Sequence, residues 1–205
     1  MYFSPKSLSY LIILLLVGIF CTGVTMIPQE QEEAVLTVVT VADFEEFVRQ
    51  TGYQTDAERY GWSFVQQDVY RYQVVKEATW QKPDGEHPPS SPNLPVTQVS
   101  YQDALAYCSW AGARLPTYSE YWDLISKDKR KVVSQSNAPF SEANAVNVLG
   151  NVWEITATLV NHTVRLAGGS RLCSPTTCHG TSPERKLYVD QQTGNIHIGF
   201  AVVYP

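Results

Sequence analysis

"PVTQVSYQDALAYCSWAGARLPTYSEYWDL", residues 95–124, carries start and stop signals for two consecutive helices. Ser100 is placed to cap the first helix, with Asp103 three residues later, and Gly112 fits its end. Thr117 opens a Thr-x-x-Glu capping box at the start of the second helix. The segment therefore predicts a short strand ahead of Ser100 and two helices after it.

The chain upstream of this segment predicts a strand and another helix. Residues 34–41, "AVLTVVTV", are rich in β-branched side chains, which is typical of a strand. Thr40 can cap the helix that follows, Phe44 and Phe47 share one of its faces, and Gly52 fits its end.

The rest of the chain reads as loops and short strands. Residues 81–95 contain five prolines and must form an irregular loop. Short strands and many turns are expected from Asn137 onward. These patterns predict an α+β fold with much irregular structure, packed around twelve tyrosines and five tryptophans.

The N-terminal residues have a different character. Lys6 precedes an apolar run at residues 8–24, "LSYLIILLLVGIFCTGV", which is typical of a secretory signal peptide or a membrane anchor. Cys21 is a candidate lipidation site, but the bulky Phe20 before it argues against this. We expect residues 1–33 to be this leader plus a charged linker, with N-terminal membrane association possible in the anchor case. Residues 34–205 should then form a single exported domain, whether periplasmic, extracellular or lumenal.

The charge pattern excludes one class of partner. The formal net charge is -5, and the sequence contains no block of lysine or arginine. Nucleic-acid binding is therefore not expected, because it needs a basic patch to neutralise phosphates.

Two cysteines near the C-terminus offer three kinds of chemistry. Cys173 and Cys178 stand in "GGSRLCSPTTC", residues 168–178. In an oxidising compartment, such spacing by itself favours a structural disulfide. Two thiolates also suit copper(I), a soft ion for which they form a complete ligand set. Zinc, with His179 adjacent, lacks a fourth ligand at standard spacing. The glycine pair before Ser170 would let the backbone pass close to a bound substrate.

Four segments in order resemble one enzyme family. They are residues 95–124, "NVLGNVWEIT" at 147–156, "GGSRLCSPTTC" at 168–178 and the "GF" at 199–200. Together they resemble the formylglycine-generating enzyme family, also called sulfatase-modifying factors, over nearly all of residues 36–205. The stretch "DFEEFVRQTGYQTDAERYGWSFV" is also similar to the family's opening helix and the loop after it.

This resemblance implies a fold and an activity. The fold would be loop-rich and C-type-lectin-like, and the enzyme would be an exported or lumenal copper-dependent oxidase. Its substrate would be a cysteine of a sulfatase or another exported protein or peptide, oxidised to formylglycine with molecular oxygen. Cys173 and Cys178 match the family's copper(I) ligands, and Ser170 matches the serine beside them. These three are the predicted catalytic residues.

The resemblance also implies a structural calcium ion. The matching ligand positions are Asn147 and Glu154 through their side chains, and Gly150 and Val152 through their carbonyls. Such hard oxygen donors suit calcium. Alternatively, Asn147 and Glu154 only cap the turn while Trp153 packs in the core.

Other chemically notable residues have structural interpretations. Cys108 is expected to be a buried free thiol, since Pro183 stands where some family members have its disulfide partner. Arg114 and Glu120 are expected to pair within the fold and to close the helix cap. The scattered residues His87, His162 and His197 are expected on the surface or in loops.

The sequence departs from the family where a substrate would bind. Family members carry several arginines after the second cysteine, whereas residues 179–190, "HGTSPERKLYVD", retain only two basic residues, Arg185 and Lys186. The chain between the predicted third helix and Asn147 is also much shorter than in family members. A second hypothesis is therefore a non-catalytic, lectin-like binding or structural module of the cell envelope. The retained Ser170 and cysteine pair favour the oxidase.

Overall fold

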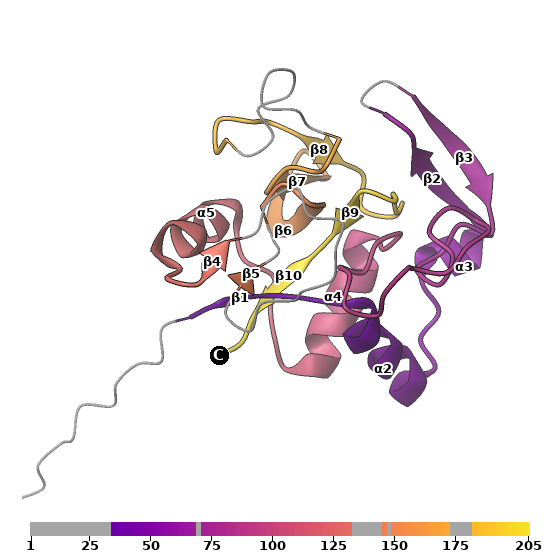
Figure 1. The fold of residues 1–205 in the computed structure, drawn as a ribbon, viewed down its shortest axis with the longest axis horizontal. Helices are drawn as coiled ribbons and strands as arrows, with labels where there is room; N and C mark the ends of the chain where they lie inside the picture. The colour runs from indigo at the N-terminus through magenta and orange to yellow at the C-terminus, as the bar shows by residue number, and fades with distance from the viewer. Residues whose placement is uncertain (1–33, 69–70, 133–144, 147–148, 173–181) are drawn as a thin grey trace, which may run out of the picture. The chain divides into compact units, whose positions relative to one another are not determined.

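A computed structural model of the protein describes residues 34–68, 71–132, 145–146, 149–172 and 182–205. Helices and short strands are interleaved along the described residues (Figure 1). No helix within these ranges is long and apolar enough to cross a bilayer. The expected leader, residues 1–33, lies outside them.

Three helices begin at the N-caps that the sequence predicts. The side chain of each N-cap residue accepts a hydrogen bond from the third helical residue, whose carboxylate in turn accepts from the N-cap backbone N–H. Gly52 and Gly112 end the first two in the left-handed conformation. These helices are α2 (Val41–Thr51) after Thr40, α4 (Tyr101–Ala111) after Ser100 and α5 (Tyr118–Lys127) after Thr117.

The expected loop after α2 contains regular structure instead. A short helix, α3 (Asp56–Tyr60), has its own capping box between Thr55 and Glu58. It leads into an antiparallel hairpin of β2 (Trp62–Gln66) and β3 (Tyr72–Lys76), which projects from one side in Figure 1.

A four-stranded sheet has the order β8-β7-β6-β9. Its long central strand, β6 (Trp153–Val160), pairs antiparallel with β7 (Thr163–Ala167) and parallel with β9 (Ile198–Gly199). The edge strand β8 (Tyr188–Val189) pairs antiparallel with β7.

Two further strand pairs join distant parts of the chain. The first described strand, β1 (Leu36–Val38), pairs antiparallel with β10 (Ala201–Val203), so the two ends of the unit 34–205 meet. Strand β4 (Lys131–Val132) pairs parallel with β5 (Ala145–Val146).

Two predicted strands differ from the structure. Strand β1 is shorter than the β-branched run at residues 34–41. No strand forms directly ahead of Ser100, where Gln98 adopts a φ of 61° and only an isolated bridge joins Pro95 to Thr40. A left-handed residue interrupts the extended backbone that a ladder requires.

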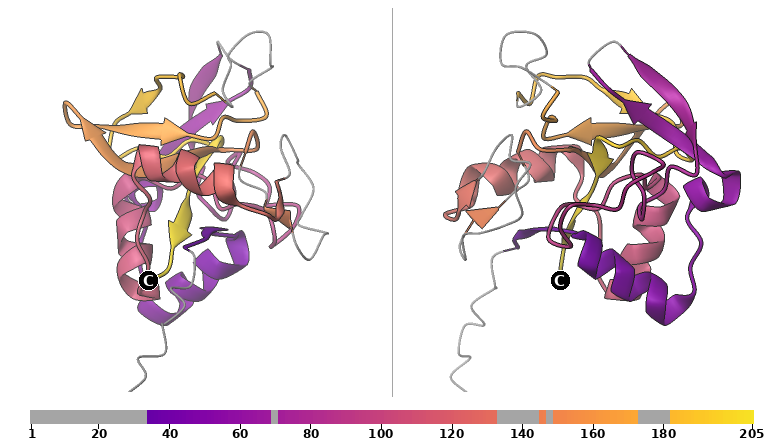
Figure 2. Two further views of the ribbon diagram at one scale, coloured as in Figure 1. Left: turned by 90° about the vertical axis from the view of Figure 1, so that its left-hand side faces the viewer. Right: turned by 45° about the vertical axis from the view of Figure 1, so that its right-hand side comes forward.

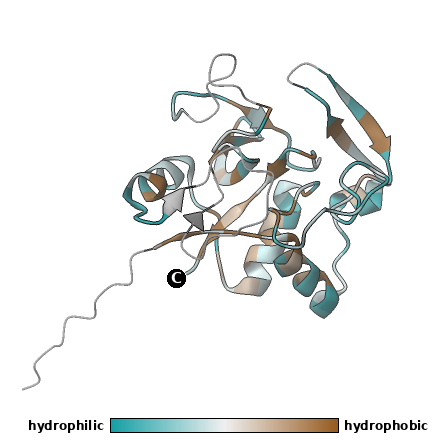
Figure 3. Cartoon of the chain, viewed as in Figure 1, coloured by the Kyte–Doolittle hydropathy of each residue, from teal (hydrophilic) through white to brown (hydrophobic). Residues whose placement is uncertain are grey.

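The core contains two clusters. In the larger one, α2 and α4 pack together (Figure 2), and Phe44 contacts Phe47, Tyr107 and Phe200 at ring-centroid distances of 5.3, 6.1 and 6.4 Å. A smaller cluster under α5 contains the buried Tyr121. Figure 3 shows hydrophobic residues along β1 and hydrophilic residues at the end of α2. The mixed helix-and-strand, single-domain fold predicted from the sequence is thus confirmed for the described residues.

Candidate functional site

Backbone hydrogen bonds hold two of the predicted motifs side by side. The amide N of Gly150 donates to the carbonyl of Gly168 at 2.7 Å, and the amide N of Arg171 donates to the carbonyl of Asn151 at 3.0 Å. The two residues of each pair belong to segments about twenty positions apart in the sequence. The turn before β6 and the turn after β7 therefore form one structural unit.

Strand β6 joins the C-terminal "GF" motif at residues 199–200 to this unit. Glu154 lies opposite Ala167 of β7 on one side and Gly199 of β9 on the other. The backbone N–H of Trp153 donates to the carbonyl of His197 at 2.7 Å. Sheet pairing thus places the "GF" at residues 199–200 beside Glu154, next to the turn that contains the predicted calcium ligands Gly150 and Val152.

Gly168 and Gly169 have φ angles of 84° and 76°, where glycine is strongly favoured. A Cβ atom at Gly168 would lie 2.5 Å from the Tyr121 Oη and 3.3 Å from the Glu154 Cγ. The structure therefore gives Gly168 a role that differs from the expected approach to a substrate: it makes room for two buried side chains.

Ser170 is buried, with 1% of its surface exposed, and its Oγ accepts a hydrogen bond from the Leu172 N–H at 3.2 Å. It lines a cavity of about 170 Å³ together with Trp153, Arg185 and Asn195. The Nε of Arg185 is buried without a hydrogen-bond partner among the described residues. The sequence signal for Arg185 was its place among the retained basic residues after the cysteine pair.

The predicted copper ligands and one calcium ligand are not among the described residues. They are Cys173, Cys178 and Asn147. Within the described ranges, no group of three or more His, Cys, Asp or Glu side chains could hold a metal ion.

Glu154 is the most unusual side chain of the unit. It is 1% exposed, and neither carboxylate oxygen has a hydrogen-bond partner in the described part of the chain. Burial raises the pKa of the Glu154 carboxyl well above its ordinary value. The turn-capping interpretation requires this carboxylate to accept hydrogen bonds from the turn, and no described residue of the turn donates one; residues 147–148 of the turn lie outside the described residues. Trp153 does pack in the core, as that interpretation expects.

Tyr121 shares this buried position and was not predicted from the sequence. Its Oη is also buried without a partner among the described residues. Burial and, secondarily, the Glu154 charge raise the pKa of the phenol well above its ordinary value. An ionised Glu154 would need a compensating cation or hydrogen-bond donors, because an uncompensated buried charge is very costly. Gly150 and Val152, both buried, lie in the adjoining turn.

The histidine and cysteine expectations are partly confirmed. His197 lies in a loop, but it is buried rather than on the surface, and its Nε2 lies 3.1 Å from the carbonyl of Gln66. Burial, followed by the charge of Arg171, lowers the pKa of His197 to about 4, so the ring is neutral near pH 7. Cys108 is a buried, free cysteine in the described part, and burial raises the pKa of its thiol to about 11.

Two ion and hydrogen-bond networks have structural roles. The Arg114 guanidinium contacts both carboxylate oxygens of Glu120 at 2.6 and 2.7 Å, which confirms their predicted pairing. A buried network that the sequence did not predict joins Ser100, Asp56 and Asp103. The Ser100 Oγ donates to Asp56 Oδ2 at 2.5 Å, and the Asp56 N–H donates to Asp103 Oδ1 at 3.0 Å.

The sequence of this chain is similar to a known protein family and to several characterised proteins. Residues 35–124 match the family model described as the sulfatase-modifying factor enzyme 1-like domain. The formylglycine-generating enzyme of Mus musculus is 45% identical over 103 residues, which are 40% of this chain and 27% of that protein. The inactive C-alpha-formylglycine-generating enzyme 2 of Mus musculus is 42% identical over 109 residues, or 43% of this chain and 34% of that protein. These alignments span about a quarter to a third of the length of these curated relatives.

A solved structure supports the fold. The structure of PvdO from Pseudomonas aeruginosa matches with a TM-score of 0.56 and 14% identity, covering 81% of this chain and 77% of that one. At that identity the likeness concerns the fold alone. Residues 35–124 match the sulfatase-modifying factor domain, and the predicted resemblance to the formylglycine-generating enzymes is confirmed.

Proposed function

We propose that this chain is a formylglycine-generating-type oxidase with the C-type-lectin-like fold of that family. It acts on a cysteine thiol of an exported protein, is itself exported by its N-terminal leader, and uses molecular oxygen as the oxidant. The observation that carries the proposal is the cavity that both Ser170 and Arg185 line. Ser170 lies three residues before Cys173 in the sequence. The similarity to formylglycine-generating enzymes supports the reaction class.

Copper(I) would be held by Cys173 and Cys178. The donor set fits this ion, because two thiolates can complete the coordination of a soft monovalent metal. When bound, copper(I) supplies the means to activate dioxygen. The protein's own part is to bind and orient the substrate thiol. In this proposal the Arg185 Nε–H, buried and without a described partner, donates to a carbonyl or carboxylate of the substrate peptide.

Calcium would be held by the turn before β6. Its ligands would be the Glu154 carboxylate, the carbonyls of Gly150 and Val152, and Asn147. The unpartnered oxygens of Glu154 support this part of the proposal, because a bound cation would stabilise the ionised carboxylate in its buried position. The ion would tie together the turn, β6 and the neighbouring Ser170 segment.

A non-catalytic binding or structural module of the cell envelope is the second candidate. It is favoured by the similarity to the mouse protein named an inactive enzyme. The sparse basic residues after the cysteine pair also favour it, because they leave fewer groups to bind a substrate.

One assay distinguishes the oxidase from the non-catalytic module. The reduced full chain, loaded with copper(I), is incubated with oxygen and a cysteine-containing peptide, and mass spectrometry follows conversion of the thiol to an aldehyde. We expect conversion, with a raised KM in Arg185→Gln and an unchanged KM in Lys186→Gln. Ser170→Ala should lower kcat at least about tenfold, which corresponds to about 1.4 kcal/mol of lost transition-state stabilisation.

Ser63→Ala is the control for folding effects. Ser63 is equally buried at 1% exposure, but its Oγ donates to the Gly194 carbonyl at 2.8 Å and does not line the Ser170 cavity. Equal loss in both serine variants would remove Ser170 from the site. No aldehyde from copper-loaded wild-type protein would favour the non-catalytic module.

A further inference from the structure

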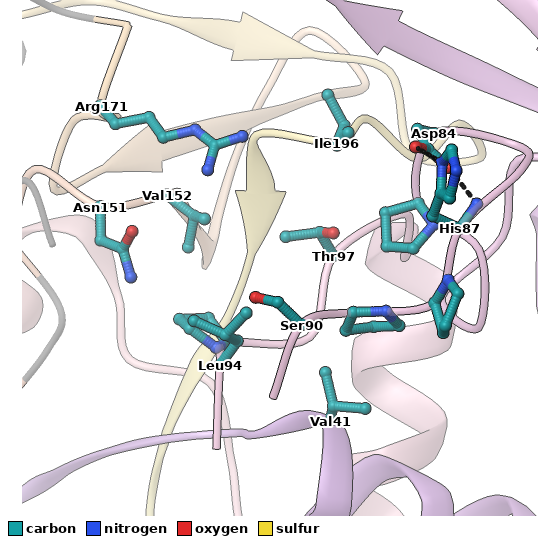
Figure 4. Close-up of a pocket in the computed structure, with 14 residues that line it drawn as sticks. Val41, Asp84, His87, Ser90, Leu94, Thr97, Asn151, Val152, Arg171 and Ile196 are labelled. Atoms are coloured by element: carbon teal, nitrogen blue, oxygen red, sulfur yellow. Dashed lines mark hydrogen bonds and ion pairs between the residues drawn. The ribbon is translucent and has the colours of Figure 1, made fainter. Parts of the chain in front are cut away.

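A cavity of about 240 Å³, shown in Figure 4, shares no lining residue with the cavity of the proposed oxidase site. A hydrogen-bonded pair of Asp84 and His87 lies at one end, and Asn151 and Arg171 lie at the other. Acidic, basic and neutral polar groups thus share its lining, and they select no single class of ligand. The contacts beside the oxidase cavity are more specific, because they converge on Arg185.

The backbone that carries Arg185 is held by a tyrosine at the start of α5. The Tyr118 Oη lies 2.7 Å from the carbonyl oxygen of Pro183 and 3.1 Å from that of Arg185. A phenol has one proton, so it donates to these two carbonyls in a shared hydrogen bond or to one at a time. In both cases the carbonyls on either side of Glu184 converge on one side-chain atom. The position of the Arg185 backbone therefore depends on Tyr118.

Tyr118 is itself fixed by three contacts. Its backbone N–H donates to the Thr158 Oγ1 of β6 at 2.8 Å, and Thr117 caps the helix directly before it. The Arg165 Cζ of β7 lies 3.4 Å from the centroid of its ring, in a close cation–π contact. The side chain is also buried. It forms a rigid anchor, because neither its backbone nor its ring can move without breaking one of these contacts.

The segment that contains Arg185 is attached to the sheet at its other end. Residues 182–185 form a turn, in which the Arg185 N–H donates to the Ser182 carbonyl at 3.1 Å. Two residues later, the Leu187 carbonyl accepts from the Leu166 N–H of β7 at 3.0 Å. Arg185 lies between the anchor at Tyr118 and this bond to β7, and it lines the oxidase cavity.

We propose that Tyr118 is a positioning residue, whose hydroxyl holds the Arg185 backbone so that the Arg185 Nε–H is directed at the substrate peptide. The direction of this donor matters, because a hydrogen bond weakens steeply as its angle closes. The ring contact with Arg165 keeps the hydroxyl in place. This inference rests on the proposed role of Arg185 in substrate binding, but it does not depend on copper or on the oxidation step.

Peptide binding by the reduced full chain, measured without oxygen, tests the proposal. The probe is the cysteine-containing peptide of the oxidase assay, labelled with fluorescein and followed by fluorescence anisotropy. Tyr118→Phe keeps the ring and removes only the hydroxyl. It should raise the Kd at least about threefold, which is within the contribution of one hydrogen bond. In the Arg185→Gln background the same change should have no further effect, because the Arg185 contact is already lost.

Tyr188→Phe is the matched control. Tyr188 lies three residues after Arg185 in β8, and the described hydrogen bonds to the Pro183 and Arg185 carbonyls come from Tyr118 instead. This variant also loses one phenol hydroxyl, and it should leave the Kd unchanged.

A second readout needs no peptide. ¹⁵N relaxation of the Arg185 Nε–H should give a lower order parameter in Tyr118→Phe than in wild type. The Nε–H of Arg130, which pairs with Asp128 and contacts the Leu36 carbonyl, serves as the internal reference and should not change.

An unchanged Arg185 order parameter, or an equal rise in Kd in the wild-type and Arg185→Gln backgrounds, would overturn the proposal. A wild-type chain that does not bind the peptide would also overturn it. Peptide binding that depends on Tyr118 only when Arg185 is present, without any aldehyde product, would support the positioning role and contradict only the oxidase proposal.

Discussion

Gly168 is a position where backbone conformation and packing both exclude a side chain. Its φ is 84°, and a Cβ there would approach the Tyr121 Oη to 2.5 Å. Gly52 provides a comparison: its φ is 66°, but nothing lies within 4 Å of the position that a Cβ would take. Gly52→Ala should cost about 1–2 kcal/mol from left-handed strain alone.

We expect Gly168→Ala to reduce the free energy of unfolding by more than Gly52→Ala, because the methyl group also displaces a buried ring. Tyr121→Phe, which removes the clashing oxygen, should recover part of the difference. Urea unfolding of wild type, the two glycine variants and the Gly168→Ala, Tyr121→Phe double variant measures these costs. Equal costs for the two glycine variants would contradict the packing role of Gly168.

Asp103 makes stability depend on pH. Burial, partly offset by hydrogen bonds from Ser100 and Asp56, raises the pKa of its carboxyl from 3.8 to about 6. Between these values the native state binds the proton that the unfolded chain has released. The stabilisation is therefore complete below pH 3.8 and is lost as the pH rises through about 6. A shift of this size corresponds to at most about 3 kcal/mol.

His197 acts in the opposite direction over part of the same range, since burial lowers its pKa from 6.5 to about 4. The informative quantity is therefore the difference in unfolding free energy between wild type and Asp103→Asn. Relative to wild type, the variant should gain stability as the pH rises from 4 to 6. A constant difference for Asp103→Asn would refute the raised pKa.

At the scale of elements, the helix caps differ in what they contact. The Ser100 Oγ accepts from the Asp103 N–H and also donates to the buried Asp56 carboxylate. The Thr117 Oγ1 accepts from the Glu120 N–H at an exposed position. Thr117→Ala should cost about 1 kcal/mol, as a lost cap does. Ser100→Ala should cost about 2–4 kcal/mol, because it also leaves a buried acceptor unsatisfied. Similar costs in thermal unfolding would contradict the buried network.

Local signals explain why the helices were predictable and other elements were not. The caps at Thr40, Ser100 and Thr117 depend on residues three positions apart, so the sequence contains the whole interaction. The same signal is present at Thr55, which caps α3 together with Glu58. In contrast, the left-handed Gln98 depends on distant contacts: its side chain donates to the Phe64 carbonyl, and Gly194 packs against its backbone. No local pattern reveals these.

The same distinction applies to the candidate sites. The family resemblance predicted Ser170 and Glu154, and sheet pairing brings their segments together. The partners of these residues were not predictable in this way. Tyr121 comes from α5 and Arg185 from the segment before β8, and only tertiary packing places them there.

At the scale of the whole molecule, the calcium proposal predicts a change in stability. A ligand that binds only the folded state at about 100 times its Kd adds about 2.7 kcal/mol. For a unit of about 170 residues this raises Tm by about 5–10 °C. We expect calcium to produce this shift in wild type but not in Glu154→Gln.

In the presence of a chelator, Glu154→Gln should be as stable as wild type or more stable, because the amide avoids burying a charge. Glu46→Gln, at the surface of α2, should retain the full calcium response. Calorimetric scans with and without calcium provide the comparison. A calcium shift that persists in Glu154→Gln would place the ion elsewhere.

Binding of copper(I) by the anaerobically reduced full chain tests the oxidase proposal most directly. Competition with a chromophoric copper(I) chelator should give about one tightly bound ion per chain. Binding should be lost in Cys173→Ser and in Cys178→Ser, and it should be retained in Cys108→Ser, which alters only the buried thiol of α4. Binding in wild type that is no tighter than in the Cys173→Ser and Cys178→Ser proteins would contradict the proposal.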